Sequence, residues 1–144
     1  MVKLITHSDL DGIGCEILFR YVEGMFDNNI DVVIAEYNDV NEIVENALNE
    51  LENGKYTELF ITDLSINNEL AKRISDNNMN VKLLDHHPSA EFLNKYKFAN
   101  VIIESGRGKE CGTSLLASHY YEYLQHVNIE IVKFIELVRQ YDTW

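Results

Sequence analysis

The feature that most constrains the fold is an alternation of short apolar runs with longer segments of helical periodicity. Short apolar runs predict buried strands, and apolar residues that recur every three or four positions predict helices. The predicted strands are 2–6, 32–35, 59–62, 81–84 and 101–103, and the predicted helices are 13–25, 40–51, 67–77, 113–124 and 129–141. This alternation is typical of βαβ units. It predicts an α/β fold with a mostly parallel five-stranded sheet and helices on both faces.

The length of the chain is that of a single domain. At 144 residues it can bury roughly two thirds of the surface of its unfolded state. Residues 1–3 lead directly into a predicted strand, without the pattern of a secretion signal, and no apolar stretch approaches the roughly 20 residues of a membrane span. We therefore expect a cytoplasmic protein with no membrane partner.

Polar side chains follow three of the predicted strands at the point where each strand ends. His7, Asp9 and Asp11 follow the first strand, Asp63 follows the third, and the run Asp85-His86-His87 follows the fourth. In an open α/β sheet, ligands bind in the crevice outside the carboxyl ends of the strands, so these side chains are expected to converge. Convergent carboxylates and imidazoles indicate a metal site.

The first of these segments carries the densest set of candidate ligands. Alternation along an extended backbone predicts that His7, Asp9 and Asp11 project to one side, and Gly12 allows a sharp turn into the helix. Carboxylate and imidazole ligands favour Mn²⁺ or Mg²⁺ over a thiolate-bound zinc. Taken alone, the segment has an alternative interpretation, because turns and helix N-caps use the same residues.

The candidates after the third and fourth strands are also weighed against structural roles. Asp63 is a candidate N-cap of the next helix, although Ser65 or Asn67 would cap it equally well. In the run 85–87, the two histidines are hard to explain by packing, since neighbouring side chains in extended chain point to opposite faces. One imidazole is expected to bind metal while the other faces substrate. Pro88 holds the residue before it in an extended conformation.

Two cysteines and two histidines lie apart from these candidates. Cys15 and Cys111 form no CxxC pair, and we expect both to be reduced and structural. His119 and His126 lie on or beside a helix among several tyrosines. They are predicted to be surface or core-edge residues without a catalytic role.

The net charge of −12 argues against binding of nucleic acid by surface electrostatics. Part of the acidity is explained by the clustered carboxylates, which are tolerable if cations neutralise them. The rest is explained as solvated helix surface, as over residues 41–52.

Some cationic and glycine-rich positions are candidates for contact with an anionic substrate. Arg107, Lys109 and Arg139 are the basic residues nearest the acidic segments in sequence, and for the first two a solvated loop is the alternative. The segment Gly112-Thr113-Ser114 enters a predicted helix, whose backbone N–H groups can hold an anion. Simple helix capping is the alternative for this segment.

Four short segments occur in order along the chain: Ser8-Asp9-Leu10-Asp11-Gly12, Thr62-Asp63-Leu64, Asp85-His86-His87 and Tyr141-Asp142-Thr143-Trp144. They resemble the four motifs of the DHH phosphoesterase superfamily. Among its branches, the chain is most similar to the nanoRNase type of oligoribonuclease, a relative of the RecJ exonucleases. The resemblance implies a Rossmann-like DHH domain and a hydrolase with two metal ions, usually Mn²⁺ with Mg²⁺ as the alternative. It also implies short single-stranded RNA or DNA oligonucleotides as substrates.

The resemblance also implies roles for individual residues. Asp9, with His7, would bind one metal ion, and Asp63 would bridge to the second. The second ion would be bound by Asp11, His86 and Asp142. His87 would contact the scissile phosphate, and Asp85 would orient a ligand from behind. Arg107, Arg139 and Thr113 are the candidates for further substrate contacts.

Family members continue past the fourth motif into a second, substrate-binding domain. We expect residues 1–144 to be the DHH catalytic domain, with that second domain absent, and hydrolysis to be weak without it. Two other functions therefore stay open. One is a phosphatase for a small nucleotide, such as 3′-phosphoadenosine 5′-phosphate or a cyclic dinucleotide product, and the other is a catalytically incomplete metal-binding domain.

Overall fold

The computed structural model describes residues 1–125 and 128–144, so His126 lies outside the described residues. Its centre is a five-stranded parallel sheet with the strand order β2-β1-β3-β4-β5. In this order β1 lies between β2 and β3. The chain first adds β2 on one side of β1, and then crosses to the other side, where it adds β3, β4 and β5 in turn. The carboxyl ends of β1 and β3 therefore flank the point where ligands bind in open α/β sheets. The strands are β1 (Val2–Thr6), β2 (Ile30–Ile34), β3 (Glu58–Thr62), β4 (Val81–Asp85) and β5 (Ala99–Val101).

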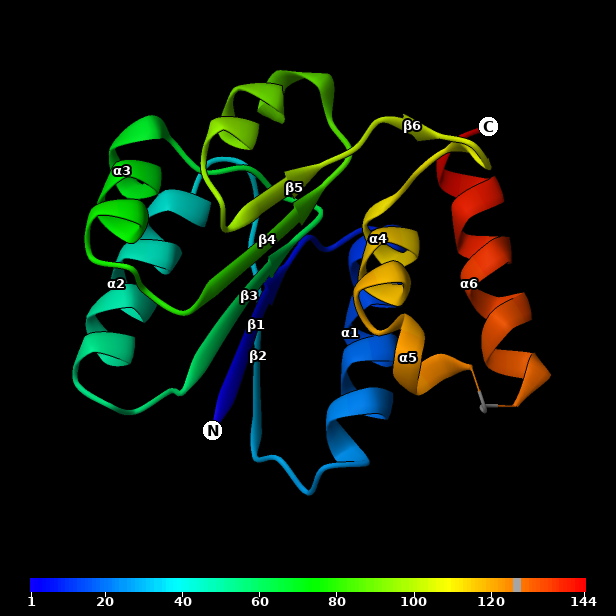
Figure 1. The fold of residues 1–144 in the computed structure, drawn as a ribbon, viewed down its shortest axis with the longest axis horizontal. Helices are drawn as coiled ribbons and strands as arrows, with labels where there is room; N and C mark the ends of the chain where they lie inside the picture. The colour runs from blue at the N-terminus through cyan, green and yellow to red at the C-terminus, as the bar shows by residue number, and fades with distance from the viewer. Residues whose placement is uncertain (126–127) are drawn as a thin grey trace.

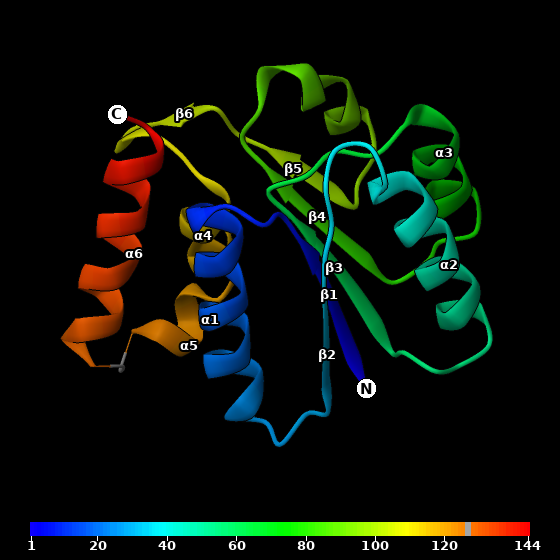
Figure 2. The same cartoon turned by 180° about the vertical axis from the view of Figure 1, so that it is seen from behind.

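Helices cover both faces of the sheet, which confirms the predicted fold class (Figures 1 and 2). On one face lie α2 (Val40–Glu52) and α3 (Asn68–Asp76), and on the other lie α1 (Leu10–Gly24) and α4 (Gly112–His119). A further helix, α6 (Ile129–Asp142), packs against α1 and α4 rather than against the sheet.

The two faces of the sheet form separate hydrophobic clusters because side chains alternate along each strand. On β1, Ile5 packs under α2 and α3, whereas Leu4 packs under α1 and α4. On β3, Ile61 and Phe60 divide in the same way. Each such fully buried side chain contributes about 1.5–3 kcal/mol by leaving water. This burial holds the carboxyl ends of the strands in register.

Three local features differ from the sequence prediction. The predicted helix 113–124 is interrupted at Tyr120, whose buried hydroxyl donates to Glu23 of α1 at 2.5 Å, and a short helix α5 (Tyr121–Leu124) follows. The segment after β4 forms a 3₁₀ helix, η1 (Pro88–Lys95). The glycine-rich stretch contains a hairpin of β6 (Glu104–Ser105) and β7 (Gly108–Lys109).

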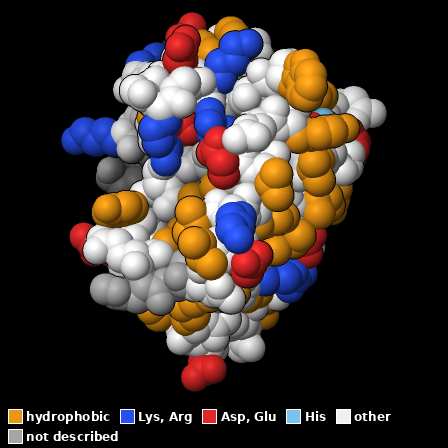
Figure 3. All heavy atoms as spheres, turned by 90° about the vertical axis from the view of Figure 1, so that its right-hand side faces the viewer, with side chains coloured by type: hydrophobic (Ala, Val, Ile, Leu, Met, Phe, Trp, Pro, Cys, Tyr) orange, Lys and Arg blue, Asp and Glu red, His pale blue; other side chains and the backbone are white. Residues whose placement is uncertain are grey.

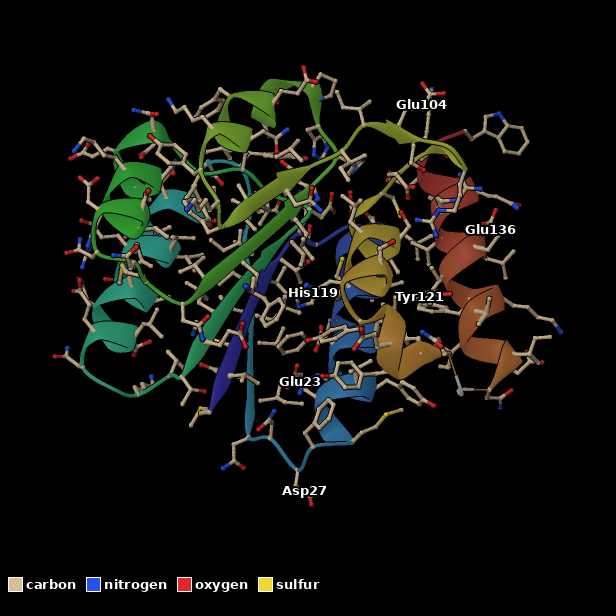
Figure 4. The ribbon with its side chains drawn as sticks, viewed as in Figure 1. Glu23, Asp27, Glu104, His119, Tyr121 and Glu136 are labelled. Carbon is tan, nitrogen blue, oxygen red and sulfur yellow. The ribbon has the colours of Figure 1, made fainter. Side chains whose placement is uncertain are left out.

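His119 occupies the edge of the core, as predicted. It lies on α4 with its side chain exposed, and its ring packs edge-on against Phe60 with centroids 5.5 Å apart (Figure 4). None of the described helices is long and apolar enough to cross a membrane.

Candidate metal centre

The end of β1 presents its polar side chains through a tight turn into α1. The helix begins at Leu10, three residues earlier than predicted, because Asp9 caps it by accepting from the Gly12 N–H at 3.0 Å. A Cβ at Gly12 would lie 2.0 Å from the carbonyl oxygen of His7, so the turn admits glycine alone. Asp11 thus lies in the first turn of α1 and not in extended chain, so strand alternation does not set its direction. Both Asp9 and Asp11 nevertheless lie near the carboxylate of Asp63.

Asp11 is fully buried and is held by the N-terminus of α4. The backbone N–H groups of Gly112 and Thr113 donate to its carboxylate at 2.5 and 2.8 Å. The Thr113 hydroxyl also donates to the Asp11 carbonyl oxygen. The positive end of the helix dipole thus stabilises a carboxylate of the protein. This corrects the expectation that Thr113 contacts substrate, since Thr113 is itself fully buried.

Asp63 follows β3 in a left-handed backbone conformation, with φ of 57°. It does not cap the next helix, because the side chain of Asn67 does so by accepting from the Leu70 N–H. Burial, together with the neighbouring carboxylates of Asp11 and Asp9, raises the pKa of Asp63 to about 10. An uncommon backbone conformation and an unfavourable charge at one residue are typical of functional sites.

The two adjacent histidines after β4 were expected to diverge, but their rings lie against each other, with centroids 4.3 Å apart. His86 Nε2 lies 3.1 Å from Asp63 Oδ1 and 3.6 Å from oxygens of both Asp11 and Asp142. His87 also borders the cluster, since one of its ring nitrogens lies within 4.8 Å of ligand atoms of Asp63 and His86, and its Nδ1 lies 2.7 Å from Asp85 Oδ1. That hydrogen bond to Asp85 raises the pKa of His87. Asp85 is fully buried and thus fixes the orientation of the His87 ring.

Asp142 reaches the cluster from the last residue of α6. Burial and the nearby carboxylate of Asp11 raise its pKa. Arg139 lies one turn earlier, where its guanidinium binds Glu136, which is labelled in Figure 4, and the carbonyl oxygen of Lys109.

Contact of Arg107 and Arg139 with substrate stays a prediction, and both guanidinium groups make ion pairs within the protein. Arg107 donates to Glu110 and to Ser118, and Glu110 is itself buried beneath the β6–β7 hairpin. These contacts tie the hairpin to α4, whereas those of Arg139 tie it to α6.

The candidate ligands form two adjoining sets. In each set, one potential ligand atom from every residue lies within 4.8 Å of the others. The first set is His7, Asp9 and Asp63, and the second is Asp11, His86 and Asp142. A third group with the same spacing, Asp63, Asp85, His86 and His87, overlaps the first set at Asp63 and the second at His86.

Unpartnered buried atoms show that these sets fit cations. Among the residues that the structure describes, the buried side-chain atoms without a hydrogen-bond partner are His7 Nδ1, Asp63 Oδ2 and Asp85 Oδ2. Leaving such atoms unpaired costs about 1–3 kcal/mol each, and more when they are charged. The first two face each other at 3.9 Å. Oxygen and imidazole donors suit Mn²⁺, and to a lesser extent Mg²⁺.

Comparison with known proteins gives a homologue over the whole chain. The chain is 35% identical to Oligoribonuclease NrnB of Bacillus subtilis (strain 168), and the match includes 100% of this chain and 37% of that protein. The chain belongs to the DHH superfamily, on its nanoRNase branch. No protein-family model matches this DHH chain.

A solved structure shares the fold of this DHH chain. It is a crystal structure of an uncharacterized protein from Helicobacter pylori G27, with a TM-score of 0.75 and 22% identity. The match covers 100% of the DHH chain and 44% of that chain. The DHH chain thus spans less than half the length of both matched proteins.

Sequence reasoning missed two residues that border the cluster in this DHH chain. Glu36 and Tyr37 follow β2, outside the four motifs. Glu36 Oε2 lies 3.2 Å from His7 Nε2, and the Tyr37 hydroxyl lies 3.3 Å from His87 Nε2. The signal was present, because the apolar run 32–35 also ends on an acidic residue, as the other three strands do.

Proposed function

We propose that this DHH domain is a metal-dependent phosphoesterase that hydrolyses phosphodiester bonds of short oligonucleotides. The observation that carries the proposal is the position of Asp63 between the two sets of ligands. Its Oδ1 lies 3.1 Å from His86 Nε2 in one set, and its Oδ2 lies 3.9 Å from His7 Nδ1 in the other. One carboxylate that reaches both sets is what a pair of cations about 3.5–4 Å apart requires.

Each ligand residue has a defined part in this proposal. Asp9 and His7 would hold one ion, Asp11, His86 and Asp142 the other, and Asp63 both. When bound, the two ions, Mn²⁺ in preference to Mg²⁺, would activate a water and neutralise charge on the phosphoryl group. The homology to a protein named an oligoribonuclease supports oligonucleotides as the substrate class.

His87 has the role of contacting the phosphate in this proposal. Its Nδ1 is held by Asp85, so its Nε2 is the atom that faces outward, where the exposed Tyr37 hydroxyl now contacts it. The hydrogen bond that His87 Nδ1–H donates to Asp85 favours the charged imidazolium, which would donate to a phosphate oxygen. Asp85 therefore acts through His87 rather than through a metal ligand.

The test is hydrolysis of labelled oligonucleotides of two to five residues in the presence of Mn²⁺, with full-length NrnB as the positive control. We expect mononucleotide release that is lost in Asp63→Ala. The matched control is Glu45→Ala, which removes one carboxylate from the exposed surface of α2 and should leave the rate unchanged.

The outcomes separate the proposed activity from the alternatives. Release of phosphate from 3′-phosphoadenosine 5′-phosphate with intact oligonucleotides would replace the proposal with a small-nucleotide phosphatase. Binding of Mn²⁺ without hydrolysis of either substrate would instead indicate a catalytically incomplete metal-binding domain.

A further inference from the structure

The loop after β2 brings a carboxylate behind one of the candidate ligands. Glu36 is fixed by its backbone, because its N–H donates to Asp39 Oδ1 at 2.7 Å and its carbonyl oxygen accepts from the N–H of Val40, the first residue of α2. Its side chain is about half exposed, and Oε2 lies 3.2 Å from His7 Nε2. The entry of α2 thus holds Glu36 against the outer edge of the His7 ring.

The two nitrogens of His7 face opposite surroundings. Nε2 faces Glu36, whereas Nδ1 lies 3.0 Å from Asp9 Oδ2 and 3.9 Å from Asp63 Oδ2. Nδ1 is buried, and despite this short distance to Asp9 it makes no hydrogen bond. The ring of Tyr37 packs against the imidazole with centroids 4.8 Å apart, which restricts its rotation.

The chemistry of the partners determines which nitrogen carries the proton in a metal-bound ring. An ionised carboxylate only accepts hydrogen bonds, so the contact with Glu36 requires a proton on Nε2. A neutral imidazole with its proton on Nε2 presents a lone pair at Nδ1. That lone pair points at the carboxylates of Asp9 and Asp63, where the first cation would be bound.

We propose that Glu36 is a positioning residue that holds His7 with Nδ1 directed at the first metal position. The proposal rests on the proposed function, since it requires the metal cluster. A carboxylate behind a metal-bound histidine fixes the orientation and proton position of the ring and increases its basicity. Glu36 therefore makes His7 a ligand, and it would favour Mn²⁺ over Mg²⁺, since imidazole is a poorer ligand for Mg²⁺.

A simpler explanation is that Glu36 adds negative charge near the cluster and attracts any cation. The two explanations differ in their dependence on His7. A positioning residue has no effect once His7 is removed, whereas a general charge effect persists. A double-mutant cycle separates them.

The experiment measures the affinity of the metal-free protein for Mn²⁺ by calorimetry in wild type, Glu36→Ala, His7→Ala and the double variant. We expect Glu36→Ala to weaken binding at the first position by about 10–100-fold. In the His7→Ala background, the same substitution should change the affinity by less than about threefold. Glu42→Ala removes an equal charge from the exposed surface of α2 and is the matched control, with affinity unchanged.

Spectroscopy provides a second readout that a purely structural role would not change. With Cd²⁺ as a diamagnetic probe, nitrogen NMR should show coupling of the ion to Nδ1 of His7 in wild type and in Glu36→Gln. The amide oxygen of Gln can still accept from Nε2, so this variant retains the orientation of the ring. In Glu36→Ala the coupling should be lost or divided between the two nitrogens.

Three results would overturn the proposal about Glu36 alone. One is an equal loss of affinity from Glu36→Ala with and without His7, another is coupling of Cd²⁺ to Nε2 in wild type, and the third is wild-type binding of Mn²⁺ that is retained in Glu36→Ala. A wild-type protein that binds no Mn²⁺ would refute the metal cluster itself, and the role of Glu36 with it.

Discussion

Asp63 combines two unfavourable features that its surroundings maintain. Its left-handed backbone costs on the order of 1–3 kcal/mol for a residue other than glycine, although aspartate tolerates it better than most. Its buried carboxyl lies among other carboxylates, which raises its pKa to about 10. In the metal-free protein at neutral pH this group is therefore protonated, and binding of a cation must release that proton.

The raised pKa of Asp63 predicts how the stability of the metal-free protein depends on pH. Between about pH 4 and 10 the folded state keeps a proton that the unfolded chain loses, so the free energy of unfolding falls as pH rises through this range. Asp63→Asn removes the titration. Urea denaturation should show a weaker decline from pH 5 to 9 for the variant than for wild type. An equal decline of the free energy of unfolding with pH in wild type and Asp63→Asn would contradict the raised pKa of Asp63.

The adjacent histidines predict a separation of binding from hydrolysis. His86→Ala should weaken Mn²⁺ binding, because Nε2 of His86 lies within 3.6 Å of three carboxylates of the cluster. His87→Ala should retain binding and lose about 10²-fold or more in the rate of oligonucleotide hydrolysis. Mn²⁺ titration and initial rates on a dinucleotide check both, in full-length protein if the domain alone is inactive. Equal loss of Mn²⁺ affinity in the two variants would contradict the separation.

At the scale of elements, the N-termini of two helices assemble the cluster. Asp9 caps α1, which directs Asp11 inward, and the N-terminus of α4 then binds the carboxylate of Asp11. At Gly112, the first residue of α4, a Cβ would lie 2.9 Å from the Cβ of Asp63, so α4 approaches the cluster as closely as glycine permits. The positions of the ligands therefore depend on the first turns of α1 and α4.

Two glycines of α1 test this dependence. Gly12→Ala would place a Cβ 2.0 Å from the backbone of His7, which cannot yield without moving the cluster. We expect a loss of about 1–3 kcal/mol of stability, as for overpacking in a core, together with lost Mn²⁺ binding. Gly24→Ala, at the end of the same helix, meets nothing within 4 Å and should stabilise by about 0.4–1 kcal/mol. Denaturant unfolding measures the free energy of unfolding of both variants. Similar values for Gly12→Ala and Gly24→Ala would refute the dependence of the cluster on the first turn of α1.

The elements also show how far the sequence could predict this structure. Periodicity is a property of the residues themselves, so it predicted the strands and most helices. The break at Tyr120 depends on a contact with Glu23, which is distant in sequence and has no local signal. The same limit applies to Thr113, because only the folded structure shows that Asp11 occupies the N-terminus of α4. Glu36 could have been predicted by applying the strand-end rule to every strand.

At the scale of the whole molecule, carboxylates are concentrated at the cluster, whereas the α6 side mixes apolar and charged side chains (Figure 3). The cluster lies at the carboxyl ends of the strands and accounts for part of the net charge of −12. The surface on the α6 side shows apolar residues interspersed with Lys, Arg, Asp and Glu (Figure 3). Val138 is the fully buried residue of α6, whereas Ile129, Leu137 and Tyr141 are each more than 60% exposed. A cation at the cluster would therefore act where repulsion among carboxylates is concentrated.

Cation binding at the cluster should stabilise the whole domain. A ligand that binds the folded state alone, at 100 times its dissociation constant, adds about 2.7 kcal/mol. For a domain of this size, that corresponds to a rise in melting temperature of roughly 5–10 °C. Millimolar Mn²⁺ should produce this rise in metal-stripped protein, and Mg²⁺ should produce less, since imidazole ligands suit it poorly.

General screening of the net charge has to be distinguished from this specific effect. NaCl at equal ionic strength reduces repulsion over the entire surface, so it serves as the reference for each melt. Asp63→Asn keeps the shape of the side chain but removes the carboxylate between the two ligand sets, so the variant should melt at the same temperature with Mn²⁺ as with NaCl. If wild type behaves in that way too, the acidic cluster is not a formed metal site. A specific rise in wild type that Asp63→Asn abolishes would instead show that a site containing Asp63 couples cation binding to the stability of the sheet.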